Sequence, residues 1–93
     1  MELRFYEDPD TGDLHIFEHG VTEEEVRQVL AHPGEDRPSS DDSRTALGQT
    51  NAGRYLRVIY VPDPGGQSAF VVTAYDLKGK ALKAYRRRRR RRK

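Results

Sequence analysis

Two segments in the second half of the chain, residues 54–61 and 69–75, most constrain how it can fold. In the first, Leu56, Val58 and Tyr60 would face one way and Tyr55, Arg57, Ile59 and Val61 the other. This period of two indicates a β-strand with two distinct faces. The second segment is the most apolar stretch of the chain, which favours a central place in a sheet. A short turn rich in Pro and Gly joins them, so we expect the two strands to pair antiparallel.

The strongest helix signal begins at Thr22, which forms a capping box with Glu25. Val26, Val29 and Leu30 follow at helical spacing, and Pro33 and Gly34 end the helix. Residues 14–19 just before it fit either a short strand or a short helix that ends at Gly20, and we favour the helix. A further helix is expected from Leu77 to Tyr85, continuing into the C-terminal arginines.

Two more strands are expected, at residues 3–6 and 44–48, and residues 34–43 are polar without periodicity and predict a loop. The expected order is therefore β-α-α-β-β-β-α. We predict a single small α+β domain, with helices on one face of an antiparallel sheet. It spans residues 1–85 and is followed by a basic tail at 86–93.

Charge divides this chain of 93 residues unevenly. Eight of its 17 Lys and Arg lie in the tail, and the other nine face all 15 Asp and Glu, so the body carries −6 and the tail +8. Such a dense block of positive charge is typical of a solvated arm that contacts nucleic acid or acidic protein surface. The chain has no Cys, no apolar run long enough to cross a membrane and no signal-peptide pattern at residues 1–10, which favours a cytoplasmic protein.

His15, Glu18 and His19 form an H-x-x-E-H pattern, which on a helix is an inverted zinc-protease signature. Zinc requires a third protein ligand, and no downstream helix offers an obvious one. Gly20 also ends the motif immediately. The pattern therefore favours no metal, and His19 is left with two roles: fixing the bend between two helices or facing a phosphate.

Several short motifs, taken together, resemble the BrnT-type toxins of bacterial toxin–antitoxin pairs and their uncharacterised relatives. In chain order they are Asp8 and Pro9; His19, Gly20 and Val21; Arg44, Ala46, Leu47 and Gly48; Gly53, Arg54, Leu56, Val58 and Tyr60; Val72, Thr73 and Ala74; and Tyr85. The family looks like a small variant of the RelE-type ribonuclease fold. The resemblance extends over most of residues 1–85.

The resemblance implies an endoribonuclease that needs no metal or other cofactor and is silenced by a small antitoxin protein. It implies a site of cations and a proton-transfer group around the scissile phosphate. The matched positions are His19, Arg44, Arg54 and Tyr85. Our predicted catalytic residues are these four and Tyr75, which could hydrogen-bond a phosphate or donate a proton. The chain departs from the family pattern at three positions, Glu18, Tyr75 and Ala81, where the family usually carries Lys, a basic residue and Glu.

Two of these departures remove cations from the implied site, and the acidic body suits a polyanionic substrate poorly. They favour an alternative function, a non-catalytic module of the same fold that binds a small protein partner or nucleic acid. Each candidate also has an ordinary structural role: strand arginines usually pair with carboxylates, and strand tyrosines usually pack. The residues that we expect to contact RNA are Arg57, Lys78, Lys80, Lys83, Arg86, Arg87, Arg88, Arg89 and Arg90.

Overall fold

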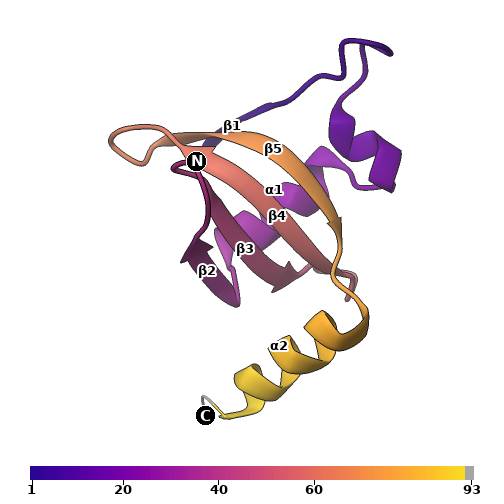
Figure 1. Cartoon of the computed structure of the whole chain (residues 1–93), viewed down its shortest axis with the longest axis vertical. Helices are drawn as coiled ribbons and strands as arrows, with labels where there is room; N and C mark the ends of the chain where they lie inside the picture. The colour runs from indigo at the N-terminus through magenta and orange to yellow at the C-terminus, as the bar shows by residue number, and fades with distance from the viewer. Residues whose placement is uncertain (92–93) are drawn as a thin grey trace.

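The computed structural model describes residues 1–91 and shows a small α+β domain (Figure 1). Its strands are β1 (Glu2–Phe5), β2 (Glu35–Pro38), β3 (Arg44–Gln49), β4 (Tyr55–Pro62) and β5 (Ser68–Asp76). Its helices are the short 3-10 helix η1 (His15–His19) and the α-helices α1 (Glu23–Ala31) and α2 (Gly79–Arg91). No helix within residues 1–91 is long and apolar enough to cross a membrane.

The five strands form one sheet in the order β1-β5-β4-β3-β2, and that sheet is mixed. Strands β3 to β5 form the antiparallel meander expected from their short connections, and β2 extends it by one strand. The prediction of a wholly antiparallel sheet was wrong, because β1 pairs in parallel with β5. This pairing joins the two ends of the domain, and no local turn signal can reveal it. The most apolar strand, β5, is interior, while β4 occupies the middle.

Residues 35–38 form an edge strand where the sequence predicted only loop. Three of the four residues of β2 are exposed, so the segment carries no alternating apolar pattern. Pro38, which lacks a backbone N–H donor, is tolerated because β2 has a partner on one side only. The strand is held mainly by its backbone pairing with β3, which periodicity does not report.

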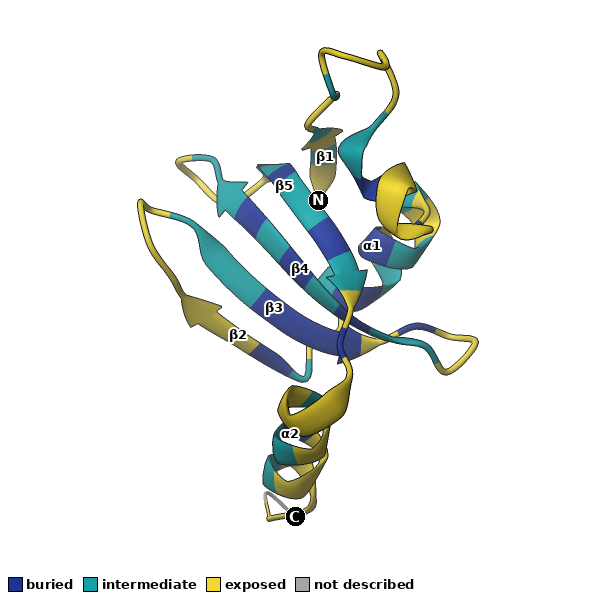
Figure 2. Cartoon of the chain, turned by 45° about the vertical axis from the view of Figure 1, so that its right-hand side comes forward, coloured by how far each residue is buried: buried dark blue, intermediate teal, exposed yellow. Residues whose placement is uncertain are grey.

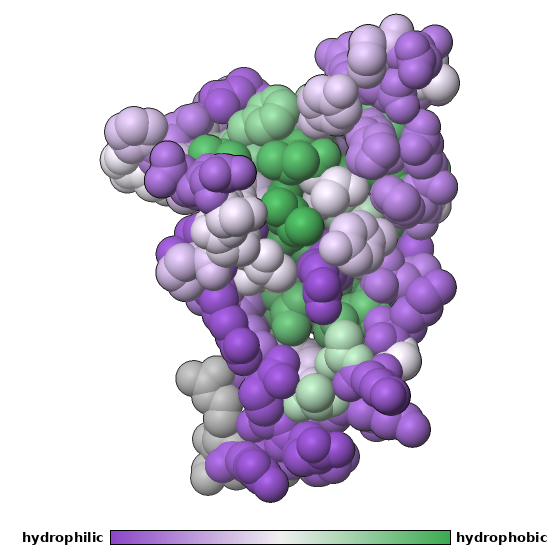
Figure 3. Space-filling view, viewed as in Figure 1, coloured by the Kyte–Doolittle hydropathy of each residue, from purple (hydrophilic) through white to green (hydrophobic). Residues whose placement is uncertain are grey.

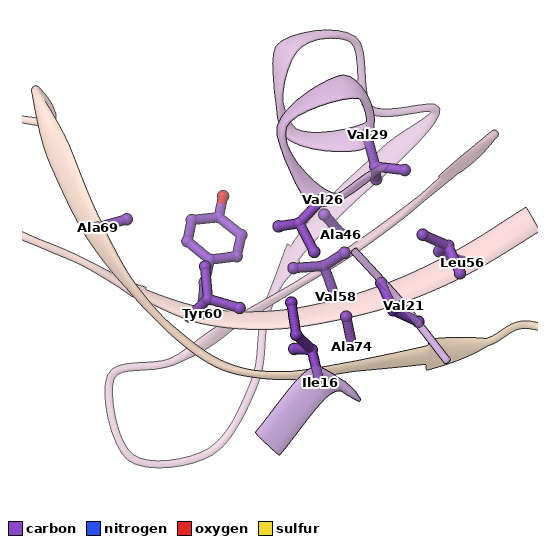
Figure 4. Close-up of a cluster of buried hydrophobic side chains, with 11 residues drawn as sticks. Ile16, Val21, Val26, Val29, Ala46, Leu56, Val58, Tyr60, Ala69 and Ala74 are labelled. Atoms are coloured by element: carbon purple, nitrogen blue, oxygen red, sulfur yellow. The ribbon is translucent and has the colours of Figure 1, made fainter. Parts of the chain in front are cut away.

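The main hydrophobic core lies between the sheet and α1 (Figure 4). Val26 and Val29 of α1 pack there against Leu56 and Val58 of β4, and all four are fully buried. The predicted capping box is confirmed: the Glu25 backbone N–H donates to Thr22 Oγ1, and the Thr22 backbone N–H donates to Glu25 Oε1. The short helix η1 adds Ile16 to this core and ends at Gly20, whose φ of 67° suits a residue without Cβ.

A second, smaller cluster places α2 on the other side of the sheet. Leu47 and Tyr55 pair across the strands with Arg57 and Gln49, so their side chains point away from α1. Leu77 and Tyr85 pack against them. The expectation that all helices cover one face was therefore wrong, since α2 lies across the end of the opposite face (Figure 2).

Candidate functional site on the open sheet face

In the view of Figure 1, α2 leaves the upper part of the sheet face opposite α1 uncovered. The register pairs Arg57 with Tyr75 and Ile59 with Thr73, which places these four side chains together on that face. All four are only partly exposed. Figure 3 looks onto this face, where apolar side chains occupy the middle and hydrophilic ones surround them. We call these residues, together with His19, the open-face site.

His19, Tyr75 and Arg57 form a continuous row on the open-face site. The rings of His19 and Tyr75 meet edge to face, with centroids 5.7 Å apart. The Arg57 guanidinium carbon lies 5.9 Å from the centre of the same Tyr75 ring. Lys78 and Asp76 complete a shallow pocket of about 400 Å³ beside His19 and Tyr75. The row thus offers a proton-transfer group, an aromatic surface and a cation to one ligand.

Two buried polar atoms of this face have no hydrogen-bond partner among the described residues: Arg57 Nε and Thr73 Oγ1. A buried donor without a partner carries a desolvation cost of about 1–3 kcal/mol, so such atoms are rare unless a ligand or water satisfies them. Nε itself is closed to solvent, so an outside ligand would meet the charged guanidinium of the partly exposed Arg57, and an oxyanion is the acceptor that this cation favours. The open-face site is therefore suited to bind a phosphate or a carboxylate.

Arg54, a predicted catalytic residue, borders this row at the His19 backbone, and its side chain holds four separate groups. Its Nε donates to Asp76 Oδ1 at 2.7 Å and its Nη1 to Glu25 Oε1 at 3.1 Å. Nη1 also donates to the Gly20 carbonyl, and Nη2 to the His19 carbonyl, at 2.8 and 3.2 Å. These hydrogen bonds lower the pKa of Asp76 and contribute to the lowered pKa of Glu25, so both carboxyls stay ionised. Arg54 thus fixes the end of η1 but has little capacity left for a substrate.

Arg44 and Tyr60 share a partner, Asp36. Arg44 Nε donates to Asp36 Oδ1 at 3.0 Å, and the Tyr60 hydroxyl donates to Asp36 Oδ2 at 2.6 Å. Burial and the nearby Asp36 carboxylate raise the pKa of Tyr60 to about 12. Arg44 therefore joins β2 to β3 and β4, away from His19.

Tyr85 is buried with 4% of its surface exposed and anchors α2 against Tyr55, whose ring centroid is 6.1 Å away. Burial raises the pKa of Tyr85. Of the five predicted catalytic residues, the structure thus brings together the side chains of His19 and Tyr75, places Arg54 against the His19 backbone, and places Arg44 and Tyr85 elsewhere.

The predicted RNA-contacting residues fall into two groups. Arg57 lies on the open-face site, and the others lie on or just before α2. Three arginines of α2 bind the body of the domain: Arg88 pairs with Glu35 at 2.6 Å, Arg89 donates to the Gly34 carbonyl at 3.0 Å, and Arg86 lies over the Tyr55 ring. The others are exposed, namely Lys78, Lys80, Lys83, Arg87 and Arg90. Arg92 and Lys93 of the predicted tail lie outside the described residues.

The Glu35–Arg88 pair should make the stability of the domain depend on pH. Hydrogen bonding and charge attraction from Arg88 lower the pKa of Glu35 from its ordinary value of 4.5. A carboxyl whose pKa is depressed by folding stabilises the domain fully above its unfolded-state pKa and loses that contribution as pH falls through the folded-state pKa. We expect Glu35→Gln to lower the free energy of unfolding by roughly 1–2 kcal/mol at pH 7, a modest amount because Arg88 is partly exposed. At pH 3 the cost should be much smaller, because protonation of Glu35 removes the contribution of its ionised form.

Urea unfolding of the wild type and of Glu35→Gln, each at pH 3 and at pH 7, measures how the cost of the substitution changes with pH. Glu7→Gln, an exposed carboxyl with no ion pair among residues 1–91, is the matched control and should cost little at either pH. An equal cost of Glu35→Gln at pH 3 and pH 7 would show that the pair does not respond to protonation.

Sequence reasoning did not identify Arg57 and Thr73 as central residues of the open-face site. Arg57 was expected to contact RNA but not to be catalytic, and Thr73 was only part of a family motif. The available signal was the strand alternation, which places Arg57 on the face opposite Leu56 and Val58. What was missing was the bulge in β5 between its pairings with Ile59 and Tyr60, which determines which β5 side chains share that face.

Fold and site together define a small α+β domain that presents an aromatic and cationic row on an open sheet face. A family model described as a domain of unknown function, DUF4258, matches residues 14–76, and the chain belongs to this family. The match runs from η1 to the end of β5, so it includes the whole open-face site and leaves out β1 and α2. No curated protein and no solved structure matches the chain.

Proposed function

We propose that this protein is a metal-independent endoribonuclease, acting as the toxin of a toxin–antitoxin pair, with its active centre at the open-face site. The observation that carries the proposal is the row of His19, Tyr75 and Arg57, with a buried Arg57 donor that lacks a partner among residues 1–91. RNA supplies both things that this row can bind: a phosphate for Arg57 and a base that can stack on Tyr75.

The reaction that these groups support is an internal transesterification. The ribose 2′-oxygen forms a bond to phosphorus while the bond from phosphorus to the 5′-oxygen breaks. His19 accepts the proton of the 2′-hydroxyl, Tyr75 donates one to the departing 5′-oxygen, and Arg57 stabilises the charge on the phosphoryl oxygens. The products are a 2′,3′-cyclic phosphate and a 5′-hydroxyl, and no metal ion is required.

The proposal includes a cytoplasmic location and a small antitoxin protein encoded beside the toxin. A protein that cleaves RNA must be restrained in the cell that makes it. The neighbouring reading frame should therefore encode a small protein that binds this chain and stops cleavage. Co-purification of the two products, and loss of RNA cleavage in the complex, would support this part of the proposal.

Incubation of a mixed RNA pool with full-length protein in excess EDTA tests the catalytic proposal. We expect cleavage by the wild type, a loss of at least 100-fold with His19→Ala and a loss of roughly 10–100-fold with Arg57→Gln. His32→Ala is the matched control, because His32 is exposed at the end of α1 and belongs to no part of the row. Its rate should equal that of the wild type. Wild-type protein that leaves the pool intact, or a His19→Ala variant as active as the wild type, would refute the catalytic proposal.

A second candidate function, nucleic-acid binding without catalysis, is favoured by the exposed cations of α2. Lys80, Lys83, Arg87 and Arg90 are all free of ion pairs among the described residues. Changing all four to Gln should weaken RNA binding and flatten its dependence on salt concentration, because fewer counterions are released. If the wild type binds RNA without cleaving it, and these changes abolish binding, α2 and not the open-face site carries the function.

A further inference from the structure

Two residues of the H-x-x-E-H pattern, which spans the whole of η1, have a partner upstream in the sequence. Asp8 faces His15 and Glu18, and one donor atom from each of the three side chains lies within 4.8 Å of the other two. These residues form a ligand set different from that of the zinc-protease signature, since His15 is joined by two carboxylates, one of them from the turn before η1, and His19 takes no part. We call Asp8, His15 and Glu18 the DHE cluster.

The turn between β1 and η1 brings Asp8 to this place. Asp8 donates its backbone N–H to the Asp13 carbonyl and accepts the Gly12 N–H on its own carbonyl, both at 2.8 Å. An isolated bridge between Glu7 and Leu14 closes the turn against the start of η1. His15 and Glu18 are three residues apart on η1, where side chains at that spacing lie above one another.

One distance within the DHE cluster matches that between ligands of a tetrahedral metal ion, and the others are longer but below 4.8 Å. His15 Nδ1 lies 3.5 Å from Glu18 Oε2 and 4.0 Å from Asp8 Oδ2. Bonds of about 2.0–2.2 Å from zinc to nitrogen and oxygen place neighbouring tetrahedral ligands about 3.3–3.6 Å apart. Small side-chain movements would therefore bring the three donors to the bonding distance of one ion.

Charge in the DHE cluster is also unbalanced. Most closely paired carboxylates elsewhere, such as Glu35 and Asp63, are bound by arginine. Within residues 1–91, the only ion-pair partner of both Asp8 and Glu18 is His15, which is charged only when protonated. Two neighbouring carboxylates beside one imidazole leave the DHE cluster with an excess of acidic groups, which a divalent cation would neutralise.

We propose that the DHE cluster binds one divalent transition-metal ion, with Zn²⁺ as the ion to test first. An imidazole nitrogen beside two carboxylates suits zinc and its neighbours in the transition series, whereas Mg²⁺ and Ca²⁺ prefer oxygen ligands throughout. With three protein ligands, a fourth position is open to water. The ion would join the turn before η1 to η1 itself and so stabilise the fold.

This site is separate from the proposed RNA site, although the two are neighbours. The His15 and His19 rings meet edge to face, with centroids 5.3 Å apart, but His19 contributes no donor to the cluster. Metal binding and RNA cleavage can therefore succeed or fail independently. Cleavage that survives EDTA leaves the metal proposal untouched, and zinc binding by a protein that cleaves nothing leaves it equally intact.

Titration of untagged full-length protein with ZnCl₂, after EDTA treatment and dialysis, tests the proposal by calorimetry. We expect one equivalent of Zn²⁺ to bind, a higher melting temperature with zinc present, and at least tenfold weaker binding by Asp8→Asn and by His15→Gln. Asp8→Asn keeps the side-chain oxygen that accepts the Asp10 N–H at 2.9 Å, so the turn should persist. Mg²⁺ and Ca²⁺ at the same concentration should not displace the zinc.

Asp10→Asn and His32→Gln are the matched controls, one in the same turn and one on α1, and both should bind zinc like the wild type. Should a cluster variant fail to fold, NMR of the wild type gives the answer, because zinc should shift the His15 imidazole signals and leave those of His32 in place. The proposal is overturned if the wild type binds no zinc, if His15→Gln binds it equally well, or if His15 does not respond.

Discussion

Arg54→Met will lower the free energy of unfolding by roughly 2–3 kcal/mol, and the melting temperature by roughly 10–20 °C. Arg54 joins the end of η1, the start of α1 and the end of β5 through its side-chain hydrogen bonds. Methionine retains most of the aliphatic length but none of the donors. The Asp76 and Glu25 carboxylates would lose their cation, and the Gly20 and His19 carbonyls would lose their donor.

The magnitude follows from how far these groups are withdrawn from water. Removing one partner of a fully buried ion pair costs about 3–5 kcal/mol, and an exposed pair is worth less than about 1 kcal/mol. Arg54 lies between these limits, since 29% of its side chain is exposed, against 23% for Glu25 and 48% for Asp76. Glu25 also forms the capping box that begins α1, so the loss of Arg54 should weaken the packing of α1 in the main core.

Urea and thermal unfolding followed by circular dichroism measure this effect. Arg87→Met is the matched control: it removes an exposed arginine of α2 that has no ion pair within residues 1–91, and its cost should stay below about 0.5 kcal/mol. A cost for Arg54→Met as small as that of the control would show that the four hydrogen bonds contribute little in water.

Gly34→Ala will destabilise the domain by roughly 1–3 kcal/mol and loosen α2 from the sheet. A Cβ atom at residue 34 would lie 1.8 Å from the Tyr85 hydroxyl oxygen and 2.8 Å from the ring carbon that bears it. The backbone cannot easily move away, because the Gly34 N–H donates to the Leu47 carbonyl at 2.8 Å. Tyr85 must therefore leave its buried position, and with it the contact that anchors α2.

A double-mutant cycle isolates this clash. Tyr85→Leu alone should be destabilising because it removes a buried ring, but Gly34→Ala should cost much less in the Tyr85→Leu background than in the wild type. Tyrosine fluorescence reports the displacement of Tyr85, and the urea midpoint reports the loss of stability. If the cost of Gly34→Ala is the same in both backgrounds, the contact with Tyr85 is not its cause.

Local patterns pointed to two residues of the candidate site, but not to the arginine that lies beside them. His19 and Tyr75 were predicted as site residues and do lie side by side. Arg44 and Arg54 were favoured over Arg57 as catalytic residues. In the structure, Arg44 and Arg54 are bound to carboxylates, whereas Arg57 Nε has no partner among the described residues. Sequence shows that an arginine lies on a strand, but not which carboxylate reaches it.

The sequence by itself determined the elements whose signals lie within a few residues. These are the capping box that begins α1, the glycine that ends η1, the alternating strands β4 and β5, and the helical spacing of α2. Each rests on hydrogen bonds or side-chain periodicity within one turn or one hairpin, so each can be recognised locally.

Only the tertiary structure decided the parallel pairing of β1 with β5, the strand at residues 35–38 and the placing of α2 opposite α1. It also decided that Arg54 supports the fold and that Asp8 meets His15 and Glu18. The β1–β5 pairing and the contacts of Arg54 join residues far apart in the chain, so their free energy exists only once the sheet has formed. The β2 strand and the Asp8 turn are closed by residues nearby, but backbone pairing and turn geometry leave no periodic pattern in the sequence.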